Sequence, residues 1–156
     1  MRYTFFMIKP DGMPSAFRIL EHLNRHLQTS SWNSETAPPF MIEACRTTLT
    51  VGQVVFLYNH AIDKIGDRWD AMIAYLTSAP VLVTCWQGDN VVEHVRKALG
   101  PTMCLDAPQS TIRGFFGTLP DGRLLRPLHE NVAHASDNPA GARRELREFF
   151  PELGYT

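Results

Sequence analysis

Short apolar runs that stop at turn-forming residues mark four candidate strands. Residues Thr4–Ile8 (TFFMI) form an apolar, β-favouring run that ends at Lys9-Pro10-Asp11-Gly12. Pro80–Trp86 (PVLVTCW) is the strongest such run, whereas Phe40–Leu49 is weaker and Asn131–Ser136 is short. Runs of this length that are rich in β-branched and aromatic residues are typical of strands in a sheet.

Five segments carry apolar residues at helical spacing between start and stop signals. The clearest follows Ser15, a candidate N-cap, and places Phe17, Leu20, Leu23 and Leu27 on one side. Ser, Thr, Asp and Asn favour helix starts because they accept hydrogen bonds from free backbone N–H groups, and Gly favours helix ends. The predicted helices are Phe17–Leu27, a segment capped by Thr50 that runs to Ile62, Arg68–Leu76, a segment capped by Asp89 that runs to Leu99 before Gly100, and a segment opened by Asn138-Pro139 that runs to Phe150 before Pro151.

The predicted elements follow one another as strand, helix, strand, helix pair, strand, helix, long loop, strand and helix. Alternation of this kind predicts a layered α/β domain in which helices pack on a sheet. Residues 29–39, rich in Ser, Thr and Pro, and most of residues 101–130, rich in Pro and Gly, are predicted to be loop. A length of 156 residues fits a single domain over residues 1–156.

Composition narrows the class of protein. Hydrophobic residues make up 44% and charged residues 20%, which is typical of a globular chain. Fifteen Lys and Arg against sixteen Asp and Glu exclude a protein that holds nucleic acid through bulk positive charge. The three cysteines contain no CxxC pair, which favours a reducing compartment over a disulfide framework or a zinc site. The chain shows no apolar stretch of membrane-spanning length and no signal-peptide pattern, so we expect a cytoplasmic protein that uses no membrane.

Several common motifs for phosphate binding and nucleophilic catalysis are missing: GxxxxGK[ST], GxGxxG after the first strand, and GxSxG. His22 and His26 lie four residues apart on a predicted helix, but no third metal ligand stands near them, so a solvated helix face is the simpler interpretation. A scattered polar set remains, which residue by residue predicts only a candidate anion site. Its members are Lys9, Arg96, Thr102, Arg113, Asn131, His134, Ser136 and Glu145.

Whole strings of sequence, taken in order, change this picture. The series opens with Met7-Ile8-Lys9-Pro10-Asp11-Gly12 and includes Asn131-Val132-Ala133-His134-Ala135-Ser136-Asp137. These strings resemble the nucleoside diphosphate kinase family over most of the chain. The resemblance implies a ferredoxin-like α+β fold, with helices packed on a four-stranded antiparallel sheet, and a homo-oligomer, either hexamer or tetramer. The other matching strings are Thr77–Val81, Trp86–Val92, Arg96–Thr102, Ser110–Gly114 and Phe149–Leu153.

The resemblance also implies a two-step reaction between nucleoside tri- and diphosphates. His134 would take the γ-phosphate as a phosphohistidine and pass it on, because a neutral imidazole nitrogen is available near pH 7. Glu145 would hold the other ring nitrogen, and Ser136 would support Glu145. Mg²⁺ would be carried by the nucleotide phosphates rather than by a set of protein ligands, and no nucleic acid is required. The implied catalytic group is His134, Glu145, Ser136 and Lys9, and the implied nucleotide-binding group is Lys9, Tyr58, Arg68, Trp69, Met72, Arg96, Thr102, Arg113 and Asn131.

Some positions depart from the family pattern. Ala135 stands where the family usually has Gly, and it would strain the backbone if this residue needs a positive φ. The Phe that stacks on the base falls at Arg68, followed by Trp69 and, one turn on, by Met72; a guanidinium plane also stacks on flat rings. Met103-Cys104-Leu105-Asp106 replaces a loop that helps build subunit contacts in many members.

Three insertions relative to the family are predicted near residues 29–39, 63–67 and 117–129. In the third, Leu119-Pro120-Asp121-Gly122 has turn chemistry, so we expect a β-hairpin beside the site that covers the nucleotide or contacts a neighbouring subunit. The leading hypothesis is an enzyme of broad base specificity, because stacking does not select strongly among bases. The alternative is a family-like domain that binds nucleotide, nucleic acid or a protein without turnover, and a phosphate-exchange assay separates the two.

Overall fold

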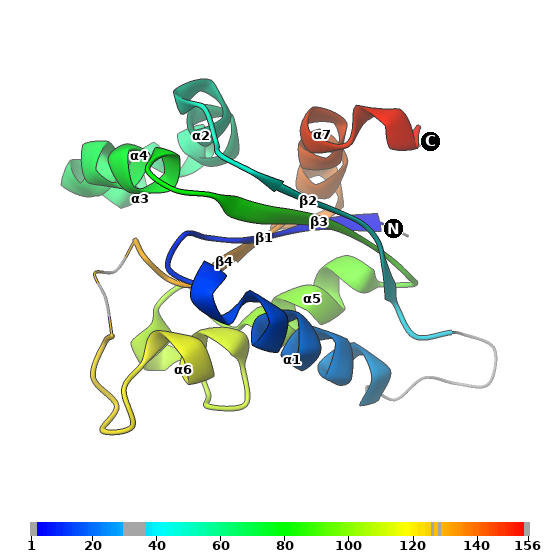
Figure 1. The fold of residues 1–156 in the computed structure, drawn as a ribbon, viewed down its shortest axis with the longest axis horizontal. Helices are drawn as coiled ribbons and strands as arrows, with labels where there is room; N and C mark the ends of the chain where they lie inside the picture. The colour runs from blue at the N-terminus through cyan, green and yellow to red at the C-terminus, as the bar shows by residue number, and fades with distance from the viewer. Residues whose placement is uncertain (1–2, 30–36, 126, 128, 155–156) are drawn as a thin grey trace.

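Four strands form one antiparallel sheet in the part of the chain that the computed structural model describes, residues 3–29, 37–125, 127 and 129–154. The order across the sheet is β2-β3-β1-β4 (Figure 1), which confirms the fold class that the family resemblance implied. β1 lies inside the sheet and pairs with both β3 and β4, with Met7 opposite His134. The strands are β1 (Tyr3–Ile8), β2 (Phe40–Thr47), β3 (Val81–Gln87) and β4 (Ala133–Ala135).

Helices cover both faces of the sheet (Figure 1). The α-helices are α1 (Ala16–Thr29), α2 (Val51–Tyr58), α3 (Ile62–Ile65), α4 (Trp69–Thr77), α5 (Val91–Leu99), α6 (Ile112–Gly117) and α7 (Pro139–Phe149). Short 3₁₀ turns connect or extend them: η1 (Met13–Ser15), η2 (Asn59–Ala61), η3 (Gly66–Arg68), η4 (Cys104–Asp106) and η5 (Pro151–Leu153). No helix within the described ranges combines the length and the apolar character that crossing a bilayer requires.

β1 divides the interior into two cores, because successive side chains of a strand point to opposite faces. Phe6 and Ile8 pack with residues of α1, α5 and α6 on one face. Phe5 and Met7 pack with residues of α2, α4 and α7 on the other. The continuous apolar run in β1 therefore reflects a strand that is buried on both faces, and its end delivers Lys9 to the interior.

The predicted helices are present, with shifted ends. The helix expected from Thr50 to Ile62 stops at Tyr58 and gives way to η2 and α3. α5 begins after Asn90, which adopts a left-handed conformation (φ 49°), rather than after Asp89. Ser15 lies in the 3₁₀ turn that leads into α1.

The prediction of loop for most of residues 101–130 missed α6. Thr111 caps this helix, and its side chain accepts a hydrogen bond from the Gly114 N–H. Gly114 and Gly117 lower the helix propensity of a six-residue segment, so the pattern resembled a loop. Gly114 is required by packing, because a Cβ there would lie 2.0 Å from the Pro108 carbonyl oxygen.

The hairpin expected after Leu119 is reduced to a tight turn closed by a single bridge, with no strand on either side of it within the described residues. Thr118 and Leu124 form an antiparallel bridge, and the Gly122 N–H donates to the Leu119 carbonyl at 2.9 Å. Gly122 has φ 82°, which suits a glycine. None of residues 117–125 lines the cavity described below, whereas His129, the last residue of the same predicted insertion, does, so covering of a nucleotide by this insertion stays a prediction. A hairpin contact with another subunit stays a prediction, and most of the 29–39 loop (residues 30–36) lies outside the described residues.

Candidate active site

A buried histidine, carboxylate and hydroxyl form the centre of the site. His134 comes from β4, Ser136 follows that strand, and Glu145 comes from α7, which packs on the same face of the sheet as α2 and α4 (Figure 1). His134 Nε2 lies 3.0 Å from Glu145 Oε1, and the Ser136 hydroxyl donates to Glu145 Oε2 at 2.5 Å. Among the described residues no hydrogen bond reaches His134 Nδ1. With Glu145 ionised, Nε2 carries the proton and Nδ1 keeps its lone pair.

Aromatic rings fix the orientation of this imidazole. The Tyr58 ring meets the His134 ring edge-on, with centroids 5.4 Å apart, and the Phe5 ring lies 6.0 Å away. The Tyr58 hydroxyl is buried without a hydrogen-bond partner in the described part of the chain. Burial raises the pKa of Tyr58, so its hydroxyl keeps its proton and is free to donate to a ligand.

Lys9 extends from the end of β1 into the same place. Its ammonium donates to Asn131 Oδ1 at 2.7 Å and to the His129 carbonyl at 3.3 Å, and it lies 5.3 Å from the centroid of the Tyr58 ring. Burial, and then the nearby Arg113 guanidinium, lower the pKa of Lys9 to about 7. An anionic ligand would restore this charge, because it replaces the lost solvation with a direct ionic contact.

Arg113, on α6, ties the surrounding loops together. Its guanidinium donates to the backbone carbonyls of Asn131 (3.2 Å), Gly100 (3.2 Å) and Ala133 (2.8 Å). Burial lowers the pKa of Arg113 to about 10, which leaves it charged at neutral pH. The Asn131 amide donates to the Thr102 carbonyl at 3.0 Å, so the chain beyond α5 is joined to the same network.

The backbone before β4 is strained at Val132, a β-branched residue with φ 75°. Asp11 holds it: Oδ2 accepts from the Val132 N–H at 2.9 Å, and the Tyr75 hydroxyl donates to Oδ1. Gly12 is required next to this turn, because a Cβ there would lie 2.6 Å from the Val132 carbonyl oxygen. Ala135 lies in β4 with an ordinary φ, so replacing the family's usual Gly causes no strain there.

Arg96, on α5, reaches the site from its open side. Its guanidinium donates to Asp137 Oδ1 at 2.6 Å, and His60 Nε2 lies 3.3 Å from Asp137 Oδ2. Desolvation opposes ionisation of Asp137. Arg96, His134 and His60 outweigh this effect and lower the pKa of Asp137 below its ordinary value. The Arg96 guanidinium is therefore paired with an ionised carboxylate in this structure.

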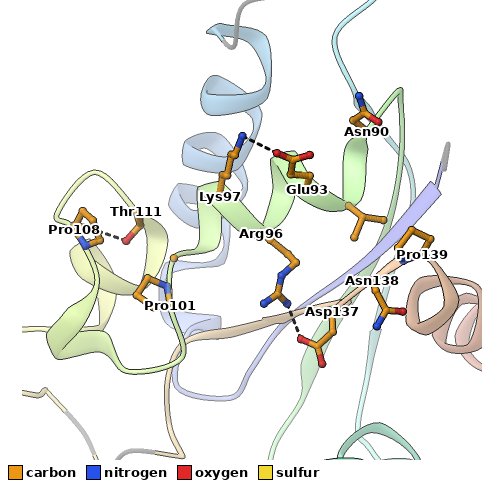
Figure 2. A pocket seen from close by; sticks show the side chains of 12 residues that line it. Asn90, Glu93, Arg96, Lys97, Pro101, Pro108, Thr111, Asp137, Asn138 and Pro139 are labelled. Atoms are coloured by element: carbon orange, nitrogen blue, oxygen red, sulfur yellow. Dashed lines mark hydrogen bonds and ion pairs between the residues drawn. The ribbon is translucent and has the colours of Figure 1, made fainter.

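His134, Tyr58 and the three cationic residues Lys9, Arg96 and Arg113 line one cavity of about 470 Å³. A second cavity, of about 720 Å³, lies between α5, the chain after it and the start of α7 (Figure 2), and it shares Arg96, Gly100 and Asp137 with the first. The predicted site residues that line the first cavity are Lys9, Tyr58, Arg68, Met72, Arg96, Thr102, Arg113, Asn131 and His134.

Three predicted site residues do not line the first cavity. Ser136 and Glu145 are buried behind His134, where they position the imidazole. Trp69 packs against the core instead, so the structure does not bring its ring to the cavity. It follows Arg68 directly on the helix, and adjacent helical residues point in different directions.

Four lining residues with polar or charged side chains were missed as site candidates: His60, Lys64, His129 and Asp137. Asp137 could have been predicted from the sequence, because it directly follows Ser136 in the string that contains His134. No local signal marks the other three, which come from a helix pair and a predicted insertion. Tertiary packing alone places them together.

Comparison with known proteins gives the family. The model of the family described as nucleoside diphosphate kinase matches residues 2–154. Nucleoside diphosphate kinases of Helianthus annuus and Oceanobacillus iheyensis are 32% and 28% identical over 152 residues, which is 97% of this chain and 90% of each relative. The nucleoside diphosphate kinase of Halobacterium salinarum, solved in complex with CDP, superposes with a TM-score of 0.74 at 26% identity, over 95% of this chain and 86% of that one. The apo enzyme of Encephalitozoon cuniculi has a TM-score of 0.76 at 23% identity, over 96% and 89% of the two chains. The chain therefore belongs to the nucleoside diphosphate kinase family.

Proposed function

We propose that this chain is a nucleoside diphosphate kinase that exchanges phosphate by a ping-pong mechanism through His134. The observation that carries the proposal is the state of the imidazole: Glu145 occupies Nε2, while Nδ1 is left without a partner among the described residues. Lys9, Arg96 and Arg113 line the same cavity and supply positive charge for phosphate oxygens. Membership of the family supports the same activity.

In the first half-reaction, the lone pair of His134 Nδ1 attacks the γ-phosphorus of a nucleoside triphosphate. The bond from that phosphorus to the bridging oxygen breaks, and the electron pair leaves with the nucleoside diphosphate. In the second, a terminal oxygen of another nucleoside diphosphate attacks the phosphohistidine, and Nδ1 regains its lone pair. Glu145 stabilises the positive charge that develops on the ring, and the Ser136 hydroxyl keeps this carboxylate in place.

We assign the two ends of the cavity to the two parts of the nucleotide. The phosphate end consists of Lys9, Arg113, Asn131 and His134, which surround the reacting nitrogen. The nucleoside end begins at Arg68 and Met72, one helical turn apart at the start of α4.

Mg²⁺ is proposed to arrive on the nucleotide. Within the described residues no three His, Cys, Asp or Glu side chains come together as a metal-holding group. The Asp137 carboxylate, at the cavity wall, is engaged with Arg96 and His60. Bound Mg²⁺ would neutralise charge on the phosphates during transfer.

A homo-oligomer is also proposed. β2 lies at one edge of the sheet, and its Phe40 and Met41 are 52% and 41% exposed. An exposed apolar edge strand favours pairing with another chain, and a second copy is the simplest partner for an enzyme of this family. No disulfide joins the cysteines within the described residues, which supports a reducing compartment such as the cytoplasm.

Incubation with γ-labelled ATP and Mg²⁺ tests the function. The label is expected on His134, stable in alkali and lost in acid, and transferable to added nucleoside diphosphate. His134→Asn should remove the label and lower kcat at least about 10⁴-fold, while nucleotide binding persists. His94→Asn, on α5 outside this cavity, is the matched control. Nucleotide binding without phosphate exchange by the unaltered protein would select the alternative of a non-catalytic binding domain.

A further inference from the structure

We propose that the His129 imidazole contacts the nucleoside part of the bound nucleotide and helps set the affinity of this enzyme for its substrates. This inference rests on the proposed function and deepens it. His129 is the last residue of the predicted 117–129 insertion, and it lines the active-site cavity.

The position of His129 is fixed from two sides. Its backbone carbonyl accepts a hydrogen bond from Lys9 Nζ at 3.3 Å, which places the residue beside the phosphate end. Its ring meets the Tyr75 ring edge-on, with centroids 5.7 Å apart, which places it against α4. Tyr75 is itself held by its hydrogen bond to Asp11. The imidazole is therefore set in place before any ligand arrives.

The same face of α4 leads to the nucleoside end. Arg68, Met72 and Tyr75 are spaced at three to four residues, so they follow one side of the helix. Arg68 and Met72 line the cavity. Tyr75, the last of these three helix residues, contacts the His129 ring. His129 thus lies between Lys9 and the α4 wall, where a nucleotide passes from its phosphates to its sugar and base.

One nitrogen of the His129 ring also makes no hydrogen bond with a described protein group. His129 Nδ1 is buried without a hydrogen-bond partner in the described ranges, and a buried polar atom of this kind carries an uncompensated desolvation cost. A hydroxyl or ring nitrogen of a nucleoside is the type of group that would satisfy it. Because Trp69 packs into the core, His129 is also a flat ring at this end that is available to pack against the ligand.

Steady-state kinetics of three variants test the assignment. His129→Ala removes the ring, His129→Phe keeps a ring without nitrogen, and His94→Ala is the matched control on α5, a half-buried histidine outside this cavity. Loss of a stacking contact is expected to raise the KM for nucleoside diphosphates about tenfold in His129→Ala, with kcat changed less than about twofold. Phosphoramidate, a donor without a nucleoside, should phosphorylate His134 at the same rate in all variants.

The pattern across variants identifies the contact. A raised KM in His129→Ala alone indicates packing by the ring, and a raised KM in both His129 variants indicates a hydrogen bond to a ring nitrogen. Unchanged KM values in both, or equal losses with phosphoramidate and nucleotides, would overturn the inference. An unaltered enzyme that exchanges no phosphate would overturn the proposed function instead, so the two failures are distinguishable.

Discussion

The phosphate end and the nucleoside end of the cavity are held by different means. Lys9 and Arg113 are 3% and 8% exposed, and their nitrogen atoms donate to carbonyl and amide oxygens that fix them from several directions. Arg68 and His129 are half-buried, and the Arg68 side chain makes no hydrogen bond or ion pair with any described residue. The phosphate end is fixed by a network of hydrogen bonds, whereas the nucleoside end combines His129, whose ring is held by its contact with Tyr75, with an Arg68 side chain that no described residue holds.

The difference matches what each part of a nucleotide demands. Phosphoryl transfer is accelerated by charges and donors that are already in place when negative charge moves in the transition state. A base is recognised through its flat face with far less directional precision, so side chains that pack on this face accept several bases. Substitutions at the phosphate end should therefore change kcat, and nucleotide affinity as well where a charged phosphate contact is lost, whereas substitutions at the nucleoside end should change KM alone.

Glu145→Gln is expected to have the largest effect of the variants that probe this contrast. An amide removes the negative charge that stabilises the ring and leaves the Ser136 hydroxyl with a weaker acceptor. We expect kcat to fall about 10- to 100-fold, with KM changed less than about threefold. Glu148→Gln, on the exposed side of the same helix, is the control. A variant with normal kcat and a raised KM would contradict the assignment of Glu145 to positioning.

A pH profile of ADP binding probes Lys9. The pKa of Lys9 is lowered to about 7 in the free protein, so this group is charged below that pH and increasingly neutral above it. If phosphate binding restores the charge, the affinity should fall about tenfold between pH 6 and pH 8. Lys9→Met lacks the titrating group, so its affinity should be lower at pH 6 and flatter with pH.

The nucleotide's own titration is common to both proteins, so the difference between the two profiles isolates Lys9. Isothermal titration calorimetry in two buffers of different ionisation enthalpy also counts the proton taken up on binding. Identical profiles for the two proteins would show that Lys9 does not change its charge in this range.

Arg68 probes the nucleoside end and should have the smallest effect. If its guanidinium plane packs on the base, both Arg68→Ala and Arg68→Lys should raise the KM for nucleoside diphosphates about two- to fivefold with kcat unchanged. If Arg68 acts only as a positive charge, Arg68→Lys should retain the normal KM. A fall in kcat in either variant would break the division between the two ends.

The local sequence pattern predicted most of the helices and strands, but not all of their ends. β1 and β3 were evident from apolar runs between turn signals, and α7 from its Asn138-Pro139 start. α6 was hidden because Gly114, which packing against Pro108 requires, weakens the helical pattern. Nothing in the local sequence predicted the strained φ of Val132, because the carboxylate that accepts its N–H belongs to Asp11, 121 residues away.

The sequence by itself determined the chemistry at the phosphate end. Lys9, Arg96, Arg113, Asn131, His134 and Glu145 stand in contiguous strings whose resemblance to a family implied their roles before any geometry was known. Only the tertiary structure decided the nucleoside end, where Trp69 turns into the core and His129 reaches the cavity through Tyr75 and Lys9. The physical reason is range: caps, turns and strand runs are set by neighbouring residues, whereas the direction of a side chain at an insertion depends on partners that lie far away along the chain.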